Sequence, residues 1–411
     1  MSKIREFVFN LPLFDTHEHQ AGYGQEWNKK DFTDFIGGYG WTDIAVSKGL
    51  DHDKETEFFE CWQYVRTTGY GQAANFATKK LFDLDFSKEN SEKITEAIKS
   101  FVKNKSSEEI YAELYKIANI NTAILDCAGP NMPEADYFTQ KLHPGFFKKV
   151  LRYGSNILNV SDVSTLKKFE KRFNKSFKTL CDLDSFLDEF TETAYKTGNL
   201  VGLKIAVAYA RNLTFEDVCF EDANAVFDDI LNEKKVDAKP LSDYLIHNIF
   251  KRAEKLNLPV QIHTGFLARC WQDVRGTNPA QLIPVFQKYK NVKFDVFHAG
   301  WPFSEILGSI GKSFPNVWLD MCWAWAMNPV QMERILDEWL SCVPCSKIFA
   351  FGADTWSPFS ALGYAEQARN GIANVLEKKM RSNEYDLETA KFVAERIMNK
   401  NAEEFFNISK K

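Results

Sequence analysis

The sequence predicts an α/β fold, a (β/α)8 TIM barrel with a large, mainly helical insertion after its first strand. Apolar segments of strand length alternate with longer amphipathic segments, which is the order of a parallel β/α barrel. Polar residues that suit metal binding follow several of these segments, and barrel enzymes carry their active sites at the carboxyl ends of their strands. The eight expected strands cover residues 11–14, 122–127, 155–160, 200–206, 259–262, 292–297, 317–321 and 347–351.

The connections between the expected strands differ greatly in length. Amphipathic segments that predict helices cover residues 241–256, 279–289, 303–314 and 329–340. Residues 21–118, between the first two strands, are rich in aromatic residues and helix formers and far exceed an ordinary βα loop. We expect this insertion to cap the active site and residues 376–411 to form terminal helices, with 1–411 as a single domain.

Composition narrows the range of partners and locations. A hydrophobic content of 45% in 411 residues suffices for a large core, and a net charge of −5 with scattered basic residues argues against a nucleic-acid partner. A small-molecule substrate is expected, and the aromatic insertion is compatible with a homo-oligomer. No segment reaches membrane-spanning length, and the N-terminus lacks a signal-peptide pattern. Eight cysteines without a secretion signal favour reduced thiols and a cytoplasmic location.

Histidines and one aspartate follow the expected strands in a pattern that suits a metal site. His17 and His19 are two residues apart, so in an extended chain their side chains point to the same face. His263, His298 and Asp354 follow the fifth, sixth and eighth strands. Imidazole and carboxylate suit zinc, iron or manganese, and we expect one or two divalent ions, with zinc preferred. The unassigned histidines, in loop or helical patterns, are His52, His143 and His247.

Two residues of this set have candidate catalytic roles, and a lysine adds a further possibility. Asp354 can bind a metal through one oxygen and accept the proton of water with the other, while His298 can stabilise developing charge. Lys204 lies inside an apolar strand, where a free ammonium is costly to bury. It is therefore paired with Asp354 or a substrate carboxylate, shifted in pKa, or carboxylated and bridging two metal ions.

Arginines and tryptophans near the strand ends are candidates for substrate binding. Arg211 follows the fourth strand and Arg275 the fifth, and guanidinium groups bind carboxylates or phosphates in a bidentate fork. Ordinary surface ion pairs are the alternative, and Arg152 is a weaker candidate. Trp301 and Trp356 lie nearest the expected ligands and can form a pocket wall.

Several motifs, in this order, resemble the amidohydrolase-related branch of the amidohydrolase superfamily. The motifs are Gly-Leu-Lys-Ile-Ala-Val-Ala-Tyr-Ala-Arg-Asn-Leu from 202, Gln-Ile-His-Thr-Gly-Phe from 261, His-Ala-Gly-Trp-Pro-Phe from 298, Pro-Asn-Val-Trp-Leu-Asp from 315 and Phe-Gly-Ala-Asp-Thr-Trp from 351. They look like the domain fused to glutamine-synthetase-like modules in fungi and plants. The insertion also resembles that of uronate isomerases, which do not hydrolyse their substrates.

The resemblance implies roles for the candidate residues. His17, His19, His263 and Asp354 match metal-ligand positions, and His298 matches a second-metal ligand or a proton shuttle. Lys204 matches a fourth-strand position where some members use lysine.

Three functions are consistent with the sequence. The first is a metal-dependent hydrolase of a small substrate, for which a negative charge is one expectation. The second is a lyase, decarboxylase or uronate-isomerase-like enzyme with a single metal ion. The third is a binding module without turnover, which an intact set of ligands disfavours.

Overall fold

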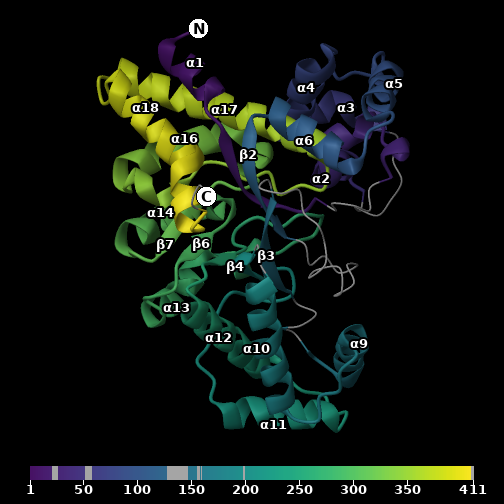
Figure 1. Cartoon of the computed structure of the whole chain (residues 1–411), viewed down its shortest axis with the longest axis vertical. Helices are drawn as coiled ribbons and strands as arrows, with labels where there is room; N and C mark the ends of the chain where they lie inside the picture. The colour runs from purple at the N-terminus through teal and green to yellow at the C-terminus, as the bar shows by residue number, and fades with distance from the viewer. Residues whose placement is uncertain are drawn as a thin grey trace.

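The protein is described by a computed structural model, which covers residues 1–20, 26–50, 58–126, 147–154, 158, 160–197 and 200–408. Eight parallel strands form one sheet in which each strand pairs with the next along the chain. Backbone hydrogen bonds join β1 to the segment after β8. The amide of Asp354 donates to the carbonyl of His17 at 2.8 Å, and that of Thr16 to Phe351 at 3.2 Å. The predicted (β/α)8 barrel is therefore confirmed (Figure 1).

Seven of the eight strands overlap their predicted segments, and β4 agrees at both ends. The bounds are β1 (Leu13–Glu18), β2 (Ile120–Asp126), β3 (Phe147–Gly154), β4 (Leu200–Ala206), β5 (Val260–Ile262), β6 (Phe294–Val296), β7 (Val317–Asp320) and β8 (Ile348–Phe349).

The third strand was predicted wrongly. The prediction placed it at 155–160, whereas β3 is Phe147–Gly154. Residues 155–157 and 159, like Cys127 at the end of the second expected strand, lie outside the described residues. The charges of Lys148, Lys149 and Arg152 interrupt the apolar pattern of β3. Because Lys149 is nevertheless buried, charge alone was a poor guide to this strand.

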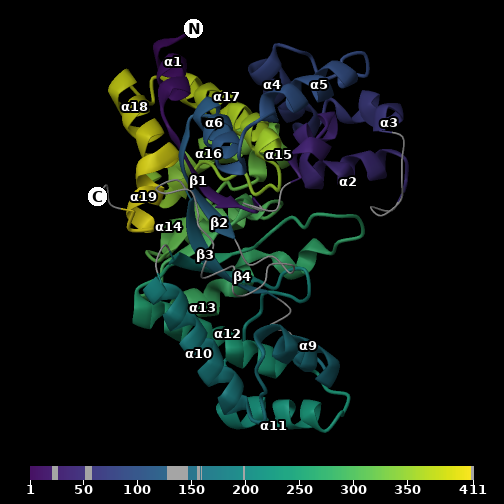
Figure 2. The ribbon, with the colours of Figure 1, turned by 45° about the vertical axis from the view of Figure 1, so that its right-hand side comes forward.

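The described part of the insertion between β1 and β2 is helical. It contains α2 (Gly37–Ser47), α3 (Phe58–Val65), α4 (Gly69–Phe82), α5 (Ser91–Val102) and α6 (Ser107–Ile117). These helices lie together at one end of the molecule, and α4 and α6 pack against α17 (Pro358–Arg381) (Figures 1 and 2). Tyr39 of α2 contacts Trp323 after β7, with ring centroids 4.7 Å apart. The insertion therefore reaches the segment that follows a barrel strand.

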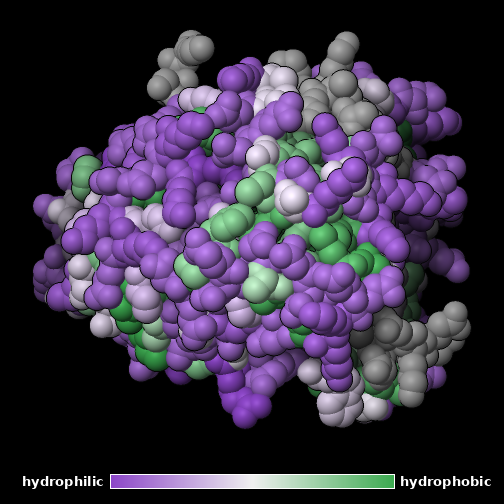
Figure 3. Space-filling view, turned by 90° about the horizontal axis from the view of Figure 1, so that it is seen from below, coloured by the Kyte–Doolittle hydropathy of each residue, from purple (hydrophilic) through white to green (hydrophobic). Residues whose placement is uncertain are grey.

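Further helices surround the barrel. They are α1 (Lys3–Asn10), α9 (Val163–Phe173), α10 (Leu180–Thr197), α11 (Phe220–Leu231), α12 (Lys239–Leu256), α13 (Ile283–Lys288), α14 (Ser304–Ser313), α15 (Ala324–Met327), α16 (Pro329–Cys342), α18 (Leu387–Glu395) and α19 (Asn401–Phe405). The end of the molecule formed by α9 to α12 is mostly hydrophilic, with a hydrophobic band across it (Figure 3). Within the described ranges, every helix is too short or too polar to span a bilayer.

Aromatic side chains near the C-terminus pack against β1 and β8, the two strands that meet where the barrel closes. Phe406 stacks on Phe14 of β1 with ring centroids 5.9 Å apart, and Phe405 contacts Phe349 of β8 at 5.1 Å. All four side chains are buried. The last helix thus holds together the two strands that meet at the ends of the sheet.

Arg369 links α17 to the ends of α1 and α6 through hydrogen bonds. It is buried, and its guanidinium donates to the carbonyls of Val8 and Leu11 at 2.7 Å, Ala118 at 3.2 Å and Asn119 at 3.0 Å. These carbonyls lie at the ends of α1 and α6, where the helices leave acceptors without internal partners. A single side chain therefore satisfies four of them.

Replacing Arg369 with lysine should lower the free energy of unfolding by roughly 2 kcal/mol. The ammonium cannot reach all four carbonyls in the fixed geometry of a guanidinium, so some buried acceptors lose their donors. Urea unfolding checks this. Arg381→Lys, an exposed position at the end of the same helix, is the control and should change stability by less than about 0.5 kcal/mol. Equal losses in both variants would contradict the assigned role.

Candidate metal centre

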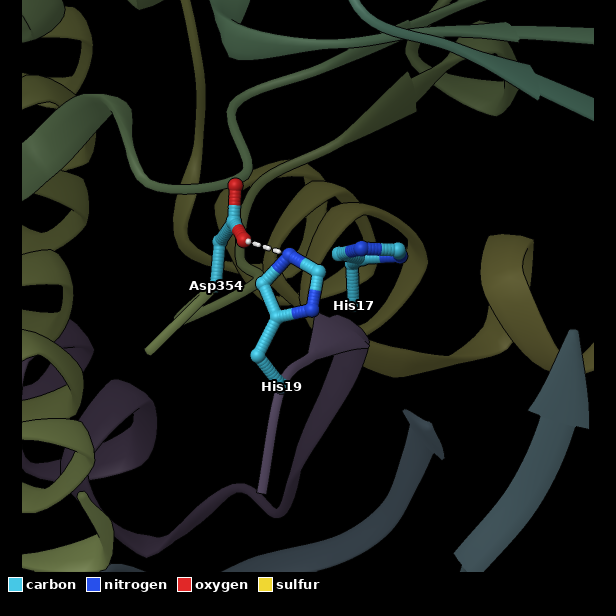
Figure 4. Close-up of side chains that lie close together, drawn as sticks. All are labelled: His17, His19 and Asp354. Atoms are coloured by element: carbon cyan, nitrogen blue, oxygen red, sulfur yellow. Dashed lines mark ion pairs between the residues drawn. The ribbon is translucent and has the colours of Figure 1, made fainter. Parts of the chain in front are cut away.

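Three side chains predicted as metal ligands meet at the carboxyl end of β1. His17 and His19 come from β1 and the residue after it, and Asp354 follows β8. Each residue offers a ligand atom, and the three atoms lie within 4.8 Å of one another. His19 Nε2 is 3.0 Å from Asp354 Oδ1, the contact drawn as a dashed line in Figure 4. The fold thus joins buried residues from opposite ends of the chain.

Gln261 of β5 determines which nitrogen of His17 faces this cluster. Its amide nitrogen donates to the carbonyl of Thr16 at 2.9 Å and to Asp295 Oδ2 at 3.0 Å. Its oxygen therefore accepts from His17 Nδ1, also at 3.0 Å, so Nδ1 carries the proton and Nε2 keeps its lone pair. Metal-ligating histidines are typically held in this way by a partner on the other nitrogen.

His263 and His298 form a second group. Nε2 of His263 faces the carbonyl of Phe266 at 3.0 Å, and Nδ1 of His298 faces that of Cys322 at 2.9 Å. Because carbonyl oxygens only accept, both of these nitrogens carry protons. The remaining nitrogens, Nδ1 of His263 and Nε2 of His298, face each other at 3.0 Å. In neutral imidazoles both carry lone pairs, so the pair calls for a proton or a metal ion.

Burial sets the protonation states of these side chains. It lowers the pKa of His17 and of His263 well below the ordinary histidine value, and it lowers the pKa of His298 to about 4. Burial alone would raise the pKa of Asp354, but the hydrogen bond and charge of His19 hold that pKa well below its usual value. At neutral pH His17, His263 and His298 are therefore neutral imidazoles and Asp354 is an anionic carboxylate, the forms that bind metal ions.

Unpaired polar atoms surround the cluster. Among the described residues, His17 Nε2, His19 Nδ1 and Asp126 Oδ1 are buried and have no hydrogen-bond partner. Buried polar atoms are rarely left unpaired in proteins. Several of them at one point fit a bound cation, and imidazole with carboxylate suits zinc, iron or manganese. The residues present therefore fit the expected divalent metal.

Asp126 and Arg152 also belong to this cluster, although the sequence analysis gave Asp126 no role. Asp126 ends β2, and its Oδ2 lies 3.6 Å from His17 Nε2 and 3.8 Å from His19 Nδ1. Arg152 of β3 donates to the same oxygen at 3.2 Å. The charge of Asp126 raises the pKa of Arg152, which remains a cation. The position of Asp126 could have identified it from the sequence, because it lies at the end of an expected strand, as the predicted ligands do.

Lys204 of β4 is buried beside these groups. Its ammonium lies 3.3 Å from the centroid of the Phe297 ring, and among the described residues it forms no ion pair with Asp354. Burial lowers the pKa of Lys204 to about 8, so part of the amine is neutral near physiological pH. A neutral amine is the form that reacts with carbon dioxide, and carboxylation of Lys204 stays a prediction.

The two arginines predicted to bind a substrate anion have other partners. Arg211 donates to Ser242 and Asp243 of α12. Arg275 is exposed and pairs with Asp273, two residues earlier, through contacts of 2.6 to 3.1 Å. The structure thus brings neither arginine into the cluster. Arg275 makes the surface ion pair that was the alternative, whereas the pair of Arg211 with Asp243 is largely buried.

Aromatic side chains line one approach to the cluster. Trp356 stacks on His19 with ring centroids 4.7 Å apart and remains 40% exposed, so it lies between the cluster and solvent. Trp301 contacts Phe266 at 5.2 Å. The position of Trp356 is thus compatible with the predicted pocket wall. Trp301 lies further from the cluster, because it contacts Phe266, whose carbonyl faces His263.

His247, the one unassigned histidine within the described residues, does not join the cluster. His247 is buried in α12, where its Nδ1 lies 2.8 Å from the hydroxyl of Tyr289. His52 and His143 lie outside the described residues.

Replacing Gln261 with leucine should weaken metal binding by about 10- to 100-fold. Leucine is similar in size but cannot accept the proton of His17 Nδ1, so the ring loses its fixed tautomer and orientation. Competition with a chromophoric chelator for Zn²⁺ measures the change. Gln281→Leu is the control, because Gln281 bonds to Thr214 and the carbonyl of Arg275 instead. A loss of the same size in both variants would contradict the role of Gln261.

Comparisons with known proteins show what this chain is similar to. The profile of a family described as amidohydrolase matches residues 228–408. The protein fluG of Emericella nidulans is 24% identical over 263 residues, which cover 61% of this chain and 29% of fluG. The chain therefore spans less than a third of that relative.

Solved structures with the same fold include proteins named as a hydrolase and as isomerases. A protein named as a metal-dependent hydrolase from Lactobacillus casei has a TM-score of 0.71 at 17% identity, covering 99% of this chain and 98% of its own. Uronate isomerase from Thermotoga maritima has a TM-score of 0.79 at 15% identity, covering 98% and 96%. Glucuronate isomerase from Caulobacter crescentus has a TM-score of 0.77 at 14% identity, covering 99% and 94%. The amidohydrolase profile thus matches the later part of the chain, from 228 to 408, and these solved structures are similar to the whole chain in fold.

Proposed function

We propose that this protein is a metal-dependent hydrolase of a small anionic substrate. The observation that carries the proposal is the convergence of His17, His19 and Asp354, all buried, with ligand atoms within 4.8 Å of one another. These residues would hold one divalent ion, with zinc preferred because imidazole and carboxylate ligands suit it. When bound, such an ion supplies Lewis acidity toward a carbonyl or related electrophile.

Two cations beside the cluster support an anionic substrate. Arg152 keeps 25% of its side chain exposed while pairing with Asp126, so its guanidinium can also meet a ligand. Lys204 lies in the neighbouring strand β4 without a carboxylate partner among the described residues. A carboxylate group of the substrate would pair with these cations and be oriented by them. Arg152 thus takes the role that the sequence suggested for Arg211 and Arg275.

Asp354 and His298 are the residues proposed to move protons. Asp354 is anionic at neutral pH and accepts the proton of an attacking water. Its Oδ2 lies 3.6 Å from His298 Nε2, so a small movement lets the histidine receive that proton and deliver it to a leaving group. Trp356, stacked on His19, would exclude bulk water on one side.

The test compares chelator-treated and Zn²⁺-reloaded protein on N-acyl amino acids and on neutral amides of the same size. We expect hydrolysis only after reloading, and a preference for the carboxylate-bearing substrates. Conversion of uronates to ketoses without hydrolysis would replace the hydrolase by an isomerase that uses the same residues. Absence of bound metal after purification without chelators would overturn both.

A further inference from the structure

We propose that Cys322 is a metal ligand and that it completes a second cation site with His298, His263 and Asp354. Cys322 follows β7 and is fully buried, as is His298. The proposed hydrolysis needs no thiol. The inference rests on the proposed function through Asp354 and His298, which belong to both; with the second ion bound, His298 Nε2 is a ligand, so its proposed proton transfer belongs to the protein with one ion.

The first support is geometric. One ligand atom each from His298, Cys322 and Asp354 lies within 4.8 Å of the others. Asp354 Oδ2 is 3.6 Å from His298 Nε2, while its other oxygen, Oδ1, is 3.0 Å from His19 Nε2. One carboxylate thus faces both groups of side chains, which is the position of a bridging ligand.

The second support is the pair of facing imidazole nitrogens. His263 Nδ1 and His298 Nε2 are 3.0 Å apart, and both carry lone pairs because the other nitrogen of each ring donates to a carbonyl. A shared proton would satisfy these two atoms alone. A metal ion bound by His298 would also use the sulfur of Cys322 and an oxygen of Asp354, and His263 Nδ1 adjoins this group through its 3.0 Å contact with His298.

The surrounding backbone makes room for the thiol. A Cβ at Gly352 would lie 2.7 Å from Cys322 Sγ, so the sulfur occupies space that only glycine leaves free. The amide of Cys322 donates to Asp320 Oδ1 at 2.7 Å, which fixes the start of its loop. His298 and Asp354 have φ angles of 65° and 49°. Such conformations are costly for non-glycine residues and occur frequently at ligand sites.

The donor chemistry indicates the kind of ion. Two imidazoles, a thiolate and a carboxylate favour Zn²⁺, Co²⁺ or Cd²⁺ over Mg²⁺ and Ca²⁺, which prefer oxygen ligands. A thiol binds metal as a thiolate, so Cys322 would release one proton to solvent for each ion bound. The second site would therefore be distinguished from the first by sulfur ligation.

Co²⁺ titration of the chelator-treated full chain tests this proposal, because thiolate ligation to Co²⁺ gives a charge-transfer band in the near ultraviolet. We expect about two equivalents to bind and the band to accompany the sulfur site. Cys322→Ser should remove the band and leave about one equivalent. Cys61→Ser, a buried cysteine of α3 in the insertion, should keep both equivalents and the band.

His17→Ala separates the two proposals, because it should weaken the first site and keep the sulfur band. Binding without the band in the wild-type protein would overturn the role of Cys322, whether or not any variant folds. A band that persists in Cys322→Ser would do the same. If metal-dependent hydrolysis is observed while the band is absent, only this inference fails. If the band appears without hydrolysis, only the proposed function fails.

Discussion

Replacing Asp354 with asparagine should lower kcat/KM for the best substrate by about 10³-fold, the upper part of the range expected when a general base is lost. Asparagine keeps the size of the side chain but has no negative charge and accepts no proton from water. It also weakens the contact with His19, now 3.0 Å from the carboxylate. Steady-state kinetics at saturating Zn²⁺ measure the effect on turnover separately from the effect on metal loading.

Asp273→Asn provides the matched control for this prediction. Asp273 loses the same charge, but it is exposed and pairs with Arg275 outside the cluster. Its activity should remain within about twofold of the wild type. The role of Asp354 is wrong if Asp354→Asn, carrying its full complement of Zn²⁺, turns over substrate as fast as Asp273→Asn.

Most of the barrel could be predicted because strand period and strand order are local properties of the sequence. The segment at β4 has an uninterrupted apolar pattern apart from Lys204, and its bounds agree with the prediction. In β3, three basic residues hide an equally regular strand. Arg152 pairs with Asp126 beside the cluster, so a charge at the candidate site removed the local signal of this strand.

The convergence of the proposed ligands could be predicted for the same reason, since each follows an expected strand and all strands of a barrel end on one face. The residues that hydrogen-bond or pair with the candidate site residues could not be predicted from the sequence. Gln261 orients His17 only because β1 and β5 are opposed across the barrel, a relation that the local pattern does not contain. Arg211 and Arg275 have the chemistry of anion binding, but the loop geometry directs them to Asp243 and Asp273 instead.

Lys204→Met should stabilise the metal-free protein while impairing its function. The folded-state pKa of Lys204 is about 8, below its ordinary value of 10.5, because burial penalises the ammonium. The unfolded chain therefore binds more protons between these two pH values, and stability rises as the pH increases through that window. Below pH 8 the full penalty is present and amounts to about 3 kcal/mol. Methionine removes this penalty and retains the apolar stem.

The expected pH dependence makes this prediction specific. The gain of Lys204→Met over the wild type, measured by urea unfolding, should be largest near pH 7 and should shrink toward pH 10.5, the ordinary lysine value. Kinetics on the reloaded protein should show a raised KM for carboxylate-bearing substrates, because one of the two cations at the cluster is lost. A constant gain at all pH values would mean that packing, and not charge, sets the cost of Lys204.

If Lys204 is carboxylated, Lys204→Met would lower the stability of the metal-loaded protein instead of raising it. A carbamate is anionic and would bridge two metal ions, so its loss in Lys204→Met would reduce metal content and lower stability. Intact mass measured in bicarbonate buffer detects the added carboxyl group directly. The metal-free and metal-loaded measurements together therefore distinguish a buried cation, which methionine relieves, from a modified ligand, which methionine cannot replace.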